Sequence, residues 1–456
     1  MTGTPTSIGE ASSEAASGPT PARVGMILGF TYGIVGLAST ATAVVVPTIR
    51  EQFDLSLATG AWIITAFVIG LAASAPIYGR IADLVGPRTP ITVGLGVMAV
   101  GAVLSAVAPT PTLLIVARGI VGAGAGSVPV LGPVIIAGRL DEPDRPGALT
   151  RMAGLAALAA SGLLLGALIA DVSSWRVVLA IPALATLFLG PVRQLSFDGD
   201  RGLSGLDIPG AIGVSAIAVG LNLVLQIGAN PTVGVIGITL SLTGVFLSIA
   251  GPRRGLTPFI PRAVLRRSAT WRIAVAAATI PACFFSLLIA VPAIFTEEFG
   301  ATRIEIGLWV LPAAIVGVAM VPVAVELRKH LTAKYIAGYG LVVAAAGLLI
   351  ASVFASEPIA LLVSFVFVAI AFSVGQAALL GLLTTATPED ERGAGLAIFM
   401  VVFFLGGGIG GTLLTVVEAA SSLPVAVGVL AALPAAAAIS TLTLQEDPRR
   451  ISAEKS

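Results

Sequence analysis

Runs of apolar residues, separated by short polar connections, extend along almost the whole chain. Each run holds about 20 residues, the length with which an α-helix crosses the hydrocarbon core of a bilayer. The runs lack the alternation of barrel strands and exceed their length, so helices are the structure that satisfies every backbone group in lipid. We predict fourteen transmembrane helices, at residues 24–47, 60–79, 90–108, 112–138, 153–170, 176–191, 208–228, 232–250, 272–296, 305–325, 335–355, 358–386, 393–417 and 422–444.

The composition fits a protein that is surrounded mostly by lipid. Hydrophobic residues make up 56% of the chain and charged residues 11%, against about 25% charged in soluble domains. The single cysteine, Cys283, leaves no internal disulfide, and the single histidine, His330, lies in a loop, which argues against a His/Cys metal centre and a Ser-His-Asp triad. We expect no cofactor, no metal and no enzyme activity, and the net charge of +1 gives no reason to expect nucleic acid as a partner.

The positive charges orient the predicted bundle. Fourteen spans place both termini on one side, and nearly all of the 25 lysines and arginines fall in loops on that side. The exceptions are Arg50, Arg176 and Arg303 in the opposite loops and Arg118 inside a span. Lysine and arginine collect in cytoplasmic loops, so we expect a multi-pass protein of the cell (plasma) membrane with both termini in the cytoplasm.

Three segments outside the spans are polar. Residues 1–23 are rich in Ser, Thr, Ala and Pro and are expected to form a disordered cytoplasmic tail. Residues 445–456 form a second cytoplasmic tail. The longest connection, 251–271, is basic and interrupted by prolines, which predicts a cytoplasmic linker at the membrane surface.

The connection between the second and third spans carries the most specific pattern, GRIADLVGPR at residues 79–88. Gly79 and Gly86 allow close backbone approach and turning. Asp83 can accept hydrogen bonds from arginines such as Arg80 and Arg88 or from a helix N-terminus. These five residues predict a conformational latch, a polar contact that holds one conformation and breaks in another. An ordinary hydrophilic turn is the alternative.

Arg118 is the only basic residue deep inside an apolar run. An ionisable residue at that depth is costly and suggests a function. It could attract polar or anionic substrate groups or respond to protonation of a nearby acid, or it could instead join helices by bonding backbone carbonyls. The glycines that follow it, among them Gly122 and Gly126, predict close helix packing.

These patterns together resemble the major facilitator superfamily. The loop at 79–88 resembles the signature between that family's second and third helices, and Arg118 to Gly126 resembles its fourth-helix arginine motif. Trp175-Arg176 resembles the start of its sixth helix. Residues 258–261 (PFIP) and the glycine-rich stretch 405–411 are similar to the fourteen-helix drug/proton antiporter branch.

The resemblance implies an all-α fold of two six-helix halves, 24–191 and 272–444, around a central cavity. Two additional helices, within 192–250, would lie between the halves in sequence. Alternating access would come from rocking of the halves. The cavity candidates are hydroxyl, aromatic and amide residues: Thr31, Tyr32, Thr42, Thr65, Phe284, Phe285 and Gln376, together with Arg118. Each of them could equally be a packing, lipid-facing or interhelical contact.

The chain also departs from the antiporter pattern. Drug/proton antiporters of this branch carry an acid in the first helix, and alignment on Pro47 puts Ala38 there. Thr31, Ala38 and Thr42 share one helix face, and no Asp or Glu lies near the middle of any predicted span. In the fifth span the family's proline is absent, although the Gly162/Gly166 spacing remains as a packing face. Both departures argue against the usual proton coupling.

A largely apolar cavity with few polar groups suits an amphipathic cargo better than a sugar or an amino acid. We therefore expect an exporter of small amphipathic or hydrophobic compounds that resembles drug-efflux proteins, with protons as a further partner if transport is coupled. Two alternatives stay open. One is an uncoupled facilitator or importer, and the other is a sensor or pseudo-transporter that has kept the fold and lost transport. The sequence fixes neither the cargo nor the oligomeric state.

Overall fold

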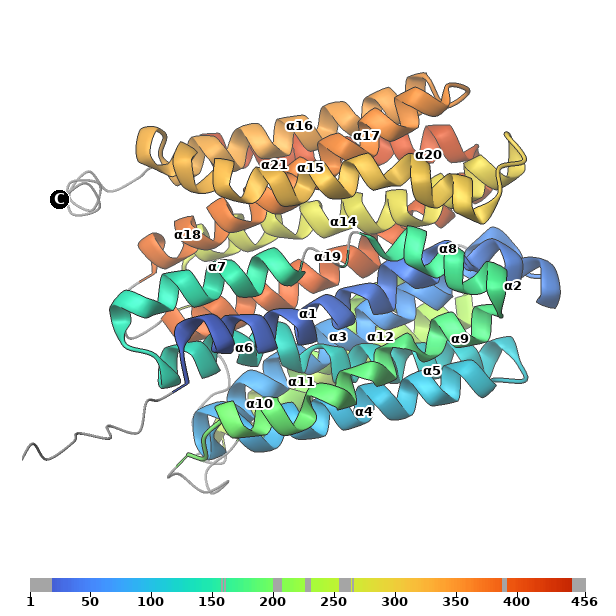
Figure 1. The fold of residues 1–456 in the computed structure, drawn as a ribbon. Coiled ribbons are helices and arrows are strands. Elements are labelled where there is room, and N and C mark those ends of the chain that lie inside the picture. Colours follow the sequence, from blue (N-terminus) through green and yellow to red (C-terminus); the bar gives the residue numbers. More distant parts are fainter. Residues whose placement is uncertain are drawn as a thin grey trace, which may run out of the picture.

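The computed structural model describes residues 19–156, 159, 161–199, 207–225, 231–253, 264, 266–387 and 392–444. In this part of the chain every regular element is helical, as predicted, and the long helices run side by side in one bundle (Figure 1). The predicted tails 1–23 and 445–456 and the linker 251–271 lie wholly or largely outside the described residues.

The helices form two sets around an inserted pair. The first set is α1 (Pro21–Ala43), α2 (Val46–Phe53), α3 (Leu57–Val85), α4 (Arg88–Val107), α5 (Pro111–Ala125), α6 (Ser127–Arg139), η1 (Glu142–Asp144), α7 (Arg145–Ala156), α8 (Gly162–Val172), α9 (Trp175–Ala180), η3 (Ile181–Phe188) and α10 (Leu189–Leu195). The inserted pair is α11 (Ile208–Val224) and α12 (Pro231–Arg253). The second set is α14 (Ser268–Glu297), α15 (Arg303–His330), α16 (Ala333–Val353), α17 (Pro358–Ile370), η4 (Ala371–Gly375), α18 (Gln376–Ala386), α19 (Arg392–Ala420), α20 (Leu423–Leu430) and α21 (Ala432–Leu442).

Local sequence signals define several of these helix starts. Ser56 accepts a hydrogen bond from the backbone N–H of Thr59 at the start of α3. Thr110 does the same for α5, which has a proline at its first position. Thr302 and Glu305 form a reciprocal capping box at the start of α15. Such caps satisfy backbone groups that a helix leaves unpaired at its N-terminus.

The predicted spans coincide with the observed helices. Twelve helices among the described residues are long and apolar enough to cross a membrane, and two shorter apolar helices, α8 and α11, occupy the predicted fifth and seventh spans. The count of fourteen is therefore close to the observed one but not confirmed by helix length. The fifth span is divided between α7 and α8, and the sixth is divided by the 3-10 helix η3.

The bundle has two distinct ends. Pro21 starts α1 at one end, and Leu444 lies at that same end, where its carbonyl accepts a hydrogen bond from Lys334 at the start of α16 (2.8 Å). We call this end the terminal face. The opposite end carries α2 and the connection between α14 and α15, and we call it the α2 face (Figure 1).

The largest cluster of buried apolar residues that joins the two sets of helices lies at the α2 face. This cluster takes members from both sets, for example Val45 and Leu163 from the first and Phe295 and Ile306 from the second. Towards the terminal face, the buried residues of the first and second sets form two different clusters, and the partly buried Phe404 of α19 packs against both. Because burial of apolar surface is a main source of cohesion, the two halves are held together most extensively at the α2 face.

α19 presents glycines to three neighbouring helices. Gly406 and Gly410 lie against α14, and Gly407 and Gly411 lie near α3 and α14. Gly408 lies against Asn222 of α11, at a distance that leaves no room for a side chain. Small residues allow membrane helices to approach closely, so α19 occupies the seam between the halves with almost no side-chain volume on these faces.

The inserted helix α11 contacts both halves. It packs on α12, on α3 and on α19. The hydroxyl of Ser215 donates a hydrogen bond to the backbone oxygen of Ala73 on α3 (2.5 Å). Asn222 is buried, and its side-chain nitrogen donates to the backbone oxygen of Ala218 on its own helix (3.2 Å).

The packing predicts an effect of filling one close approach. A Cβ added at Gly122 of α5 would overlap the backbone of Phe67 on α3, so Gly122→Ala should destabilise the protein by about 1–3 kcal/mol. The matched control is Gly96→Ala on α4, where a Cβ meets no atom within 4 Å and the change should be neutral or slightly stabilising. Thermal melting in detergent measures both, and equal melting temperatures would contradict the predicted close packing.

Candidate functional site

The loop after α3 is held in place by the segment that follows α10. Gly86 ends α3 with a φ of 77°, and a Cβ there would come too close to the backbone of Phe197 and Gly199. The N–H of Gly199 donates to the oxygen of Val85 (2.8 Å), and the N–H of Arg88 donates to the oxygen of Phe197 (3.3 Å). Glycine at position 86 therefore meets both a backbone requirement and a steric one.

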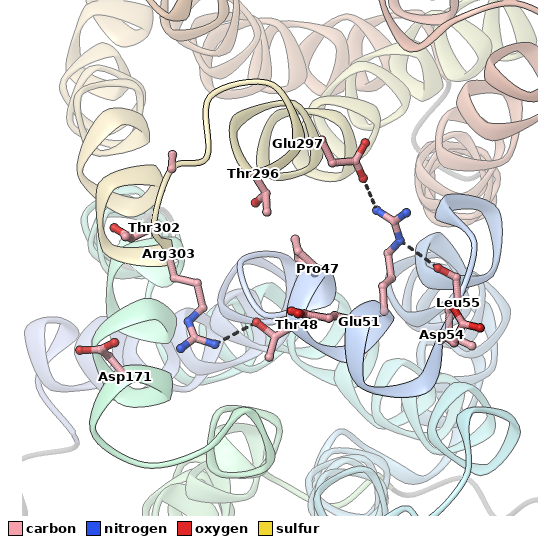
Figure 2. A pocket seen from close by; sticks show the side chains of 12 residues that line it. Pro47, Thr48, Glu51, Asp54, Leu55, Asp171, Thr296, Glu297, Thr302 and Arg303 are labelled. Carbon is pink, nitrogen blue, oxygen red and sulfur yellow. Dashed lines mark hydrogen bonds and ion pairs between the residues drawn. The ribbon is translucent and has the colours of Figure 1, made fainter.

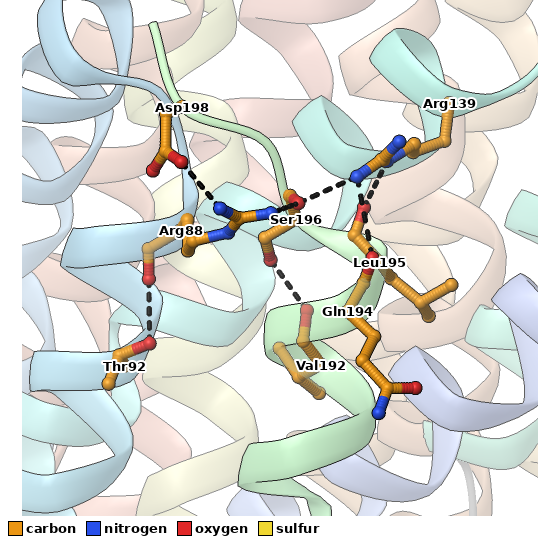
Figure 3. A network of polar contacts seen from close by, with 8 residues as sticks. All are labelled: Arg88, Thr92, Arg139, Val192, Gln194, Leu195, Ser196 and Asp198. Atoms are coloured by element: carbon orange, nitrogen blue, oxygen red, sulfur yellow. Dashed lines mark hydrogen bonds and ion pairs between the residues drawn. The ribbon is translucent and has the colours of Figure 1, made fainter.

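Arg88 and Arg139 extend this contact into a polar network (Figure 3). Arg88 pairs with Asp198 at 2.5 Å and donates to the backbone oxygen of Ser196 at 3.0 Å. Arg139, the last residue of α6, donates to the backbone oxygens of Leu195 (2.6 Å), Ser196 (2.8 Å) and Gln194 (3.3 Å). A guanidinium has several donors in a fixed plane, so Arg139 satisfies carbonyls that the C-terminus of α10 leaves unpaired.

The predicted latch residues do not all act together. Arg80 and Asp83 lie three residues apart on α3, with 3.9 Å between the charged atoms. That distance is an ion pair but too long for a hydrogen bond. Gly79 contacts Val130 at an ordinary van der Waals distance. Gly86 and Arg88 make short contacts, and their partners are in the segment 196–199 of the same half.

Arg118 is completely buried between α1, α3 and α5. Its Nε donates to the backbone oxygen of Ile63 (3.1 Å) and its Nη2 to that of Ala38 (2.6 Å). Its guanidinium also lies over the ring of Phe67, 5.0 Å from the centroid. Its Nη1 is buried and has no hydrogen-bond partner among the described residues. Arg118 thus joins three helices and keeps a donor nitrogen that no described residue uses.

The first-helix candidates lie in a closed, hydroxyl-bearing environment. Thr31 and Thr42 are buried, and each donates to a backbone oxygen one turn earlier, Ile27 (2.7 Å) and Ala38 (2.8 Å) respectively. The oxygen of Ala38 therefore accepts from both Thr42 and Arg118. At the position that alignment on Pro47 matches with the antiporter carboxylate, the side chain is the methyl group of Ala38, and Arg118 bonds the backbone oxygen of that residue. Tyr32, the next residue after Thr31, is half-buried.

Two further candidates meet at the seam between the halves. Thr65 of α3 is buried and faces Gly411 of α19, where a Cβ would lie 2.9 Å from the threonine hydroxyl. Phe285 of α14 packs beside Gly407 of α19. Phe284 belongs to an aromatic group, with its ring 5.0 Å from that of Phe372.

Gln376 directly follows an irregular turn. Residues Ala371–Gly375 form a π-helical turn, and Gln376 starts α18 half-buried. Such turns insert one residue into a helix and occur often at functional sites. No described contact brings Gln376 into hydrogen-bond distance of the other candidates, so it stays a separate feature of the second half.

The predicted packing glycines lie at helix contacts. Gly122 and Gly126 face α3, and Gly162 and Gly166 face α1 near Ala41. Sequence reasoning missed the partners in the polar networks, Asp198 and Arg139. The one signal for them was charge close to a span end, which does not specify a partner. In the described part of the chain no group of three or more His, Cys, Asp or Glu could hold a metal.

Comparison with known proteins places this geometry in context. The family model of the Major Facilitator Superfamily matches residues 28–411 and 273–456. The chain is 27% identical to the cephamycin export protein CmcT of Amycolatopsis lactamdurans, over 69% of this chain and 67% of that protein. It is 25% identical to multidrug resistance protein 3 of Bacillus subtilis (64% and 58%) and 30% identical to the puromycin resistance protein pur8 of Streptomyces alboniger (44% and 41%). The matches to the last two span less than two thirds of the relatives' lengths.

The network around α10 gives a stability prediction. Arg139→Gln removes donors to the α10 carbonyls and should destabilise the protein by about 1–3 kcal/mol. It should also increase proteolysis of the connection after α10. Arg193→Gln is the matched control, because Arg193 is an exposed arginine in the last turn of α10 and its loss removes the same charge. Similar protease sensitivity of the two variants would contradict the capping role.

Proposed function

Because this chain belongs to the major facilitator superfamily of membrane transporters, we propose that it exports small amphipathic or hydrophobic compounds by alternating access. The names of its relatives support this proposal, since they describe cephamycin export, multidrug resistance and puromycin resistance. Identities of 25–30% over part of each chain leave the cargo of this protein as a proposal. The proposal includes a location in the plasma membrane and a small-molecule cargo as the partner.

The chemistry of the interior is the observation that carries the proposal. Among the described buried polar residues, most are serines and threonines, and Arg118 is the only buried basic one. Thr31, Thr42 and Thr65 present hydroxyl groups within an apolar core, and Phe284 and Phe285 add aromatic surface. A mostly apolar site with a few polar groups suits an amphipathic compound, whereas a sugar would need many more paired donors and acceptors.

The charges and the packing are consistent with the proposed export. The Lys/Arg distribution supports a cytoplasmic terminal face, and the α2 face would then be directed outwards. The halves share one hydrophobic cluster at the α2 face and form two different large clusters towards the terminal face. This arrangement supports a conformation that receives cargo from the cytoplasm. The loop residues Gly86 and Arg88 with Arg80 and Asp83 would regulate the change to the outward conformation.

An uncoupled facilitator is the second candidate, and one observation favours it. Arg118 bonds the backbone oxygen of Ala38, the residue that aligns with the expected acid, and Asp207, the only buried acid among the described residues, caps the start of α11 away from Arg118. A proton carrier needs a group that exchanges protons within the pathway. If protons drive export here, they must act at a site different from that of the antiporter pattern.

Transport in proteoliposomes tests the proposal directly. The assay measures the movement of fluorescent amphipathic cations and neutral drugs by the purified protein under an imposed pH gradient. Movement that depends on the gradient and is abolished by a proton ionophore would establish proton-coupled export. Movement only down the cargo's own gradient would establish the facilitator. Absence of movement for the whole panel, in protein that is folded by thermal melting, would contradict the proposed cargo class.

Arg118→Lys separates the two roles of the buried arginine. The planar guanidinium of Arg118 bonds the backbone oxygens of Ile63 and Ala38 and has a further donor nitrogen. The single ammonium group of lysine cannot reproduce this geometry. Loss of a charged hydrogen bond costs about 1.5–3 kcal/mol, so we expect a lower melting temperature and an initial transport rate per folded protein reduced by roughly tenfold or more. A lower melting temperature with an unchanged transport rate would show that Arg118 only joins helices.

A further inference from the structure

Two side-chain hydrogen bonds join the halves across the α2 face (Figure 2). Arg50 of α2 pairs with Glu297, the last residue of α14, at 2.8 Å. Arg303, the first residue of α15, donates to the hydroxyl of Thr48 on α2 at 2.9 Å. We call these four residues the α2 clasp. They line a cavity of about 630 Å³ between α2 and the connection from α14 to α15.

The side chain of Arg50 is ordered by contacts within its own half, independently of Glu297. Its Nε donates to the backbone oxygen of Leu55 (3.4 Å), and its aliphatic carbons lie so close to Gly60 that a Cβ there would come within 2.5 Å. Its side chain is only 18% exposed, whereas that of Glu297 is 56% exposed. Most surface ion pairs contribute little because two long side chains must be ordered. Here one of the two is already ordered by its own half.

The short helix α2 is attached to the first half by side-chain contacts with α9. The indole N–H of Trp175 on α9 donates to the side-chain oxygen of Gln52 on α2 (2.7 Å). The ring of Phe53 packs edge-on against the same indole, with centroids 6.2 Å apart. Thr48 and Arg50 are therefore carried by a helix that is fixed to the first half, and their partners belong to the second.

The guanidinium of Arg303 finds little electrostatic stabilisation within its own helix, α15. A cation at a helix N-terminus faces the positive end of the macrodipole, and the acid of that first turn, Glu305, bonds Thr302 in the capping box. The structure gives the Arg303 guanidinium its hydrogen bond across the seam, to Thr48. Both contacts of the clasp thus link the halves and are not required to form the helices that carry them.

We propose that the α2 clasp is a gate that holds the outward face closed and must open before cargo can leave. This inference rests on the proposed alternating access. The hydrophobic cluster beneath the clasp supplies most of the cohesion of this face. The clasp adds polar contacts that water replaces at small cost when the halves separate, so its strength adjusts the ratio of closed to open protein without changing the fold.

Spin-label distance measurements across the α2 face test the clasp without cargo. Labels are attached to Ser173→Cys in the first half and Ser356→Cys in the second, both exposed, in a Cys283→Ala background. In membrane nanodiscs, Glu297→Gln should raise the population with the longer distance relative to the shorter one by roughly two- to fivefold, as expected for loss of one ion pair of this kind. Glu297→Arg should raise it further, and the reversed pair Arg50→Glu with Glu297→Arg should restore the closed population in part.

Glu298→Gln is the matched control, because Glu298 is the next residue, is also exposed and lies outside the clasp. An unchanged distance distribution for Glu297→Gln, or an equal change for Glu298→Gln, would overturn the proposal. The outcome is independent of the transport assay. A protein that transports none of the tested compounds would still show the Glu297 effect if the clasp is correct, and a transporting protein without that effect would refute the clasp alone.

Discussion

The hydrophobic cluster shared by both halves at the α2 face is the constraint on which the rest of the arrangement depends. It brings α1, α2 and α8 of the first half against α14 and α15 of the second, and it holds that face of the seam closed while the buried residues of the two halves form two different clusters towards the terminal face. Apolar burial is not directional, so it brings the halves together without fixing their register. Polar contacts such as those of Arg50 and Arg303 supply that register.

Within the first half, the side chains near Ala38 bond to backbone oxygens and not to a carboxylate. The oxygen of Ala38 accepts from Thr42 and Arg118, and the oxygen of Ile63 accepts from Arg118 as well. A buried cation is tolerated when it is hydrogen-bonded, and here carbonyl dipoles take over part of what a carboxylate would do. Those dipoles do not titrate, so the charge of this region does not follow pH in the way that an Asp–Arg pair would.

Much of the fold was predictable because span length and charge placement are strong local signals. The predicted spans coincide with observed helices, and Gly86 was identified as a turn residue from its position alone. The partners of Arg88, Arg139 and Arg50 were not predictable, because each contact joins residues that are far apart in sequence. Gln376 stood out as a polar residue within an apolar run, but periodicity could not reveal the π-helical turn before it.

The glycine-lined faces of α19 have a mechanical consequence. Helices that interlock through large side chains must lift ridges out of grooves before they can slide. α19 meets α14, α3 and α11 with Gly406, Gly408, Gly410 and their neighbours, so displacement along its axis requires little repacking of side chains. Of these three contacts, the one with α3 belongs to the seam between the halves, and there Gly407 and Gly411 leave few side chains of α19 to be repacked when the halves move.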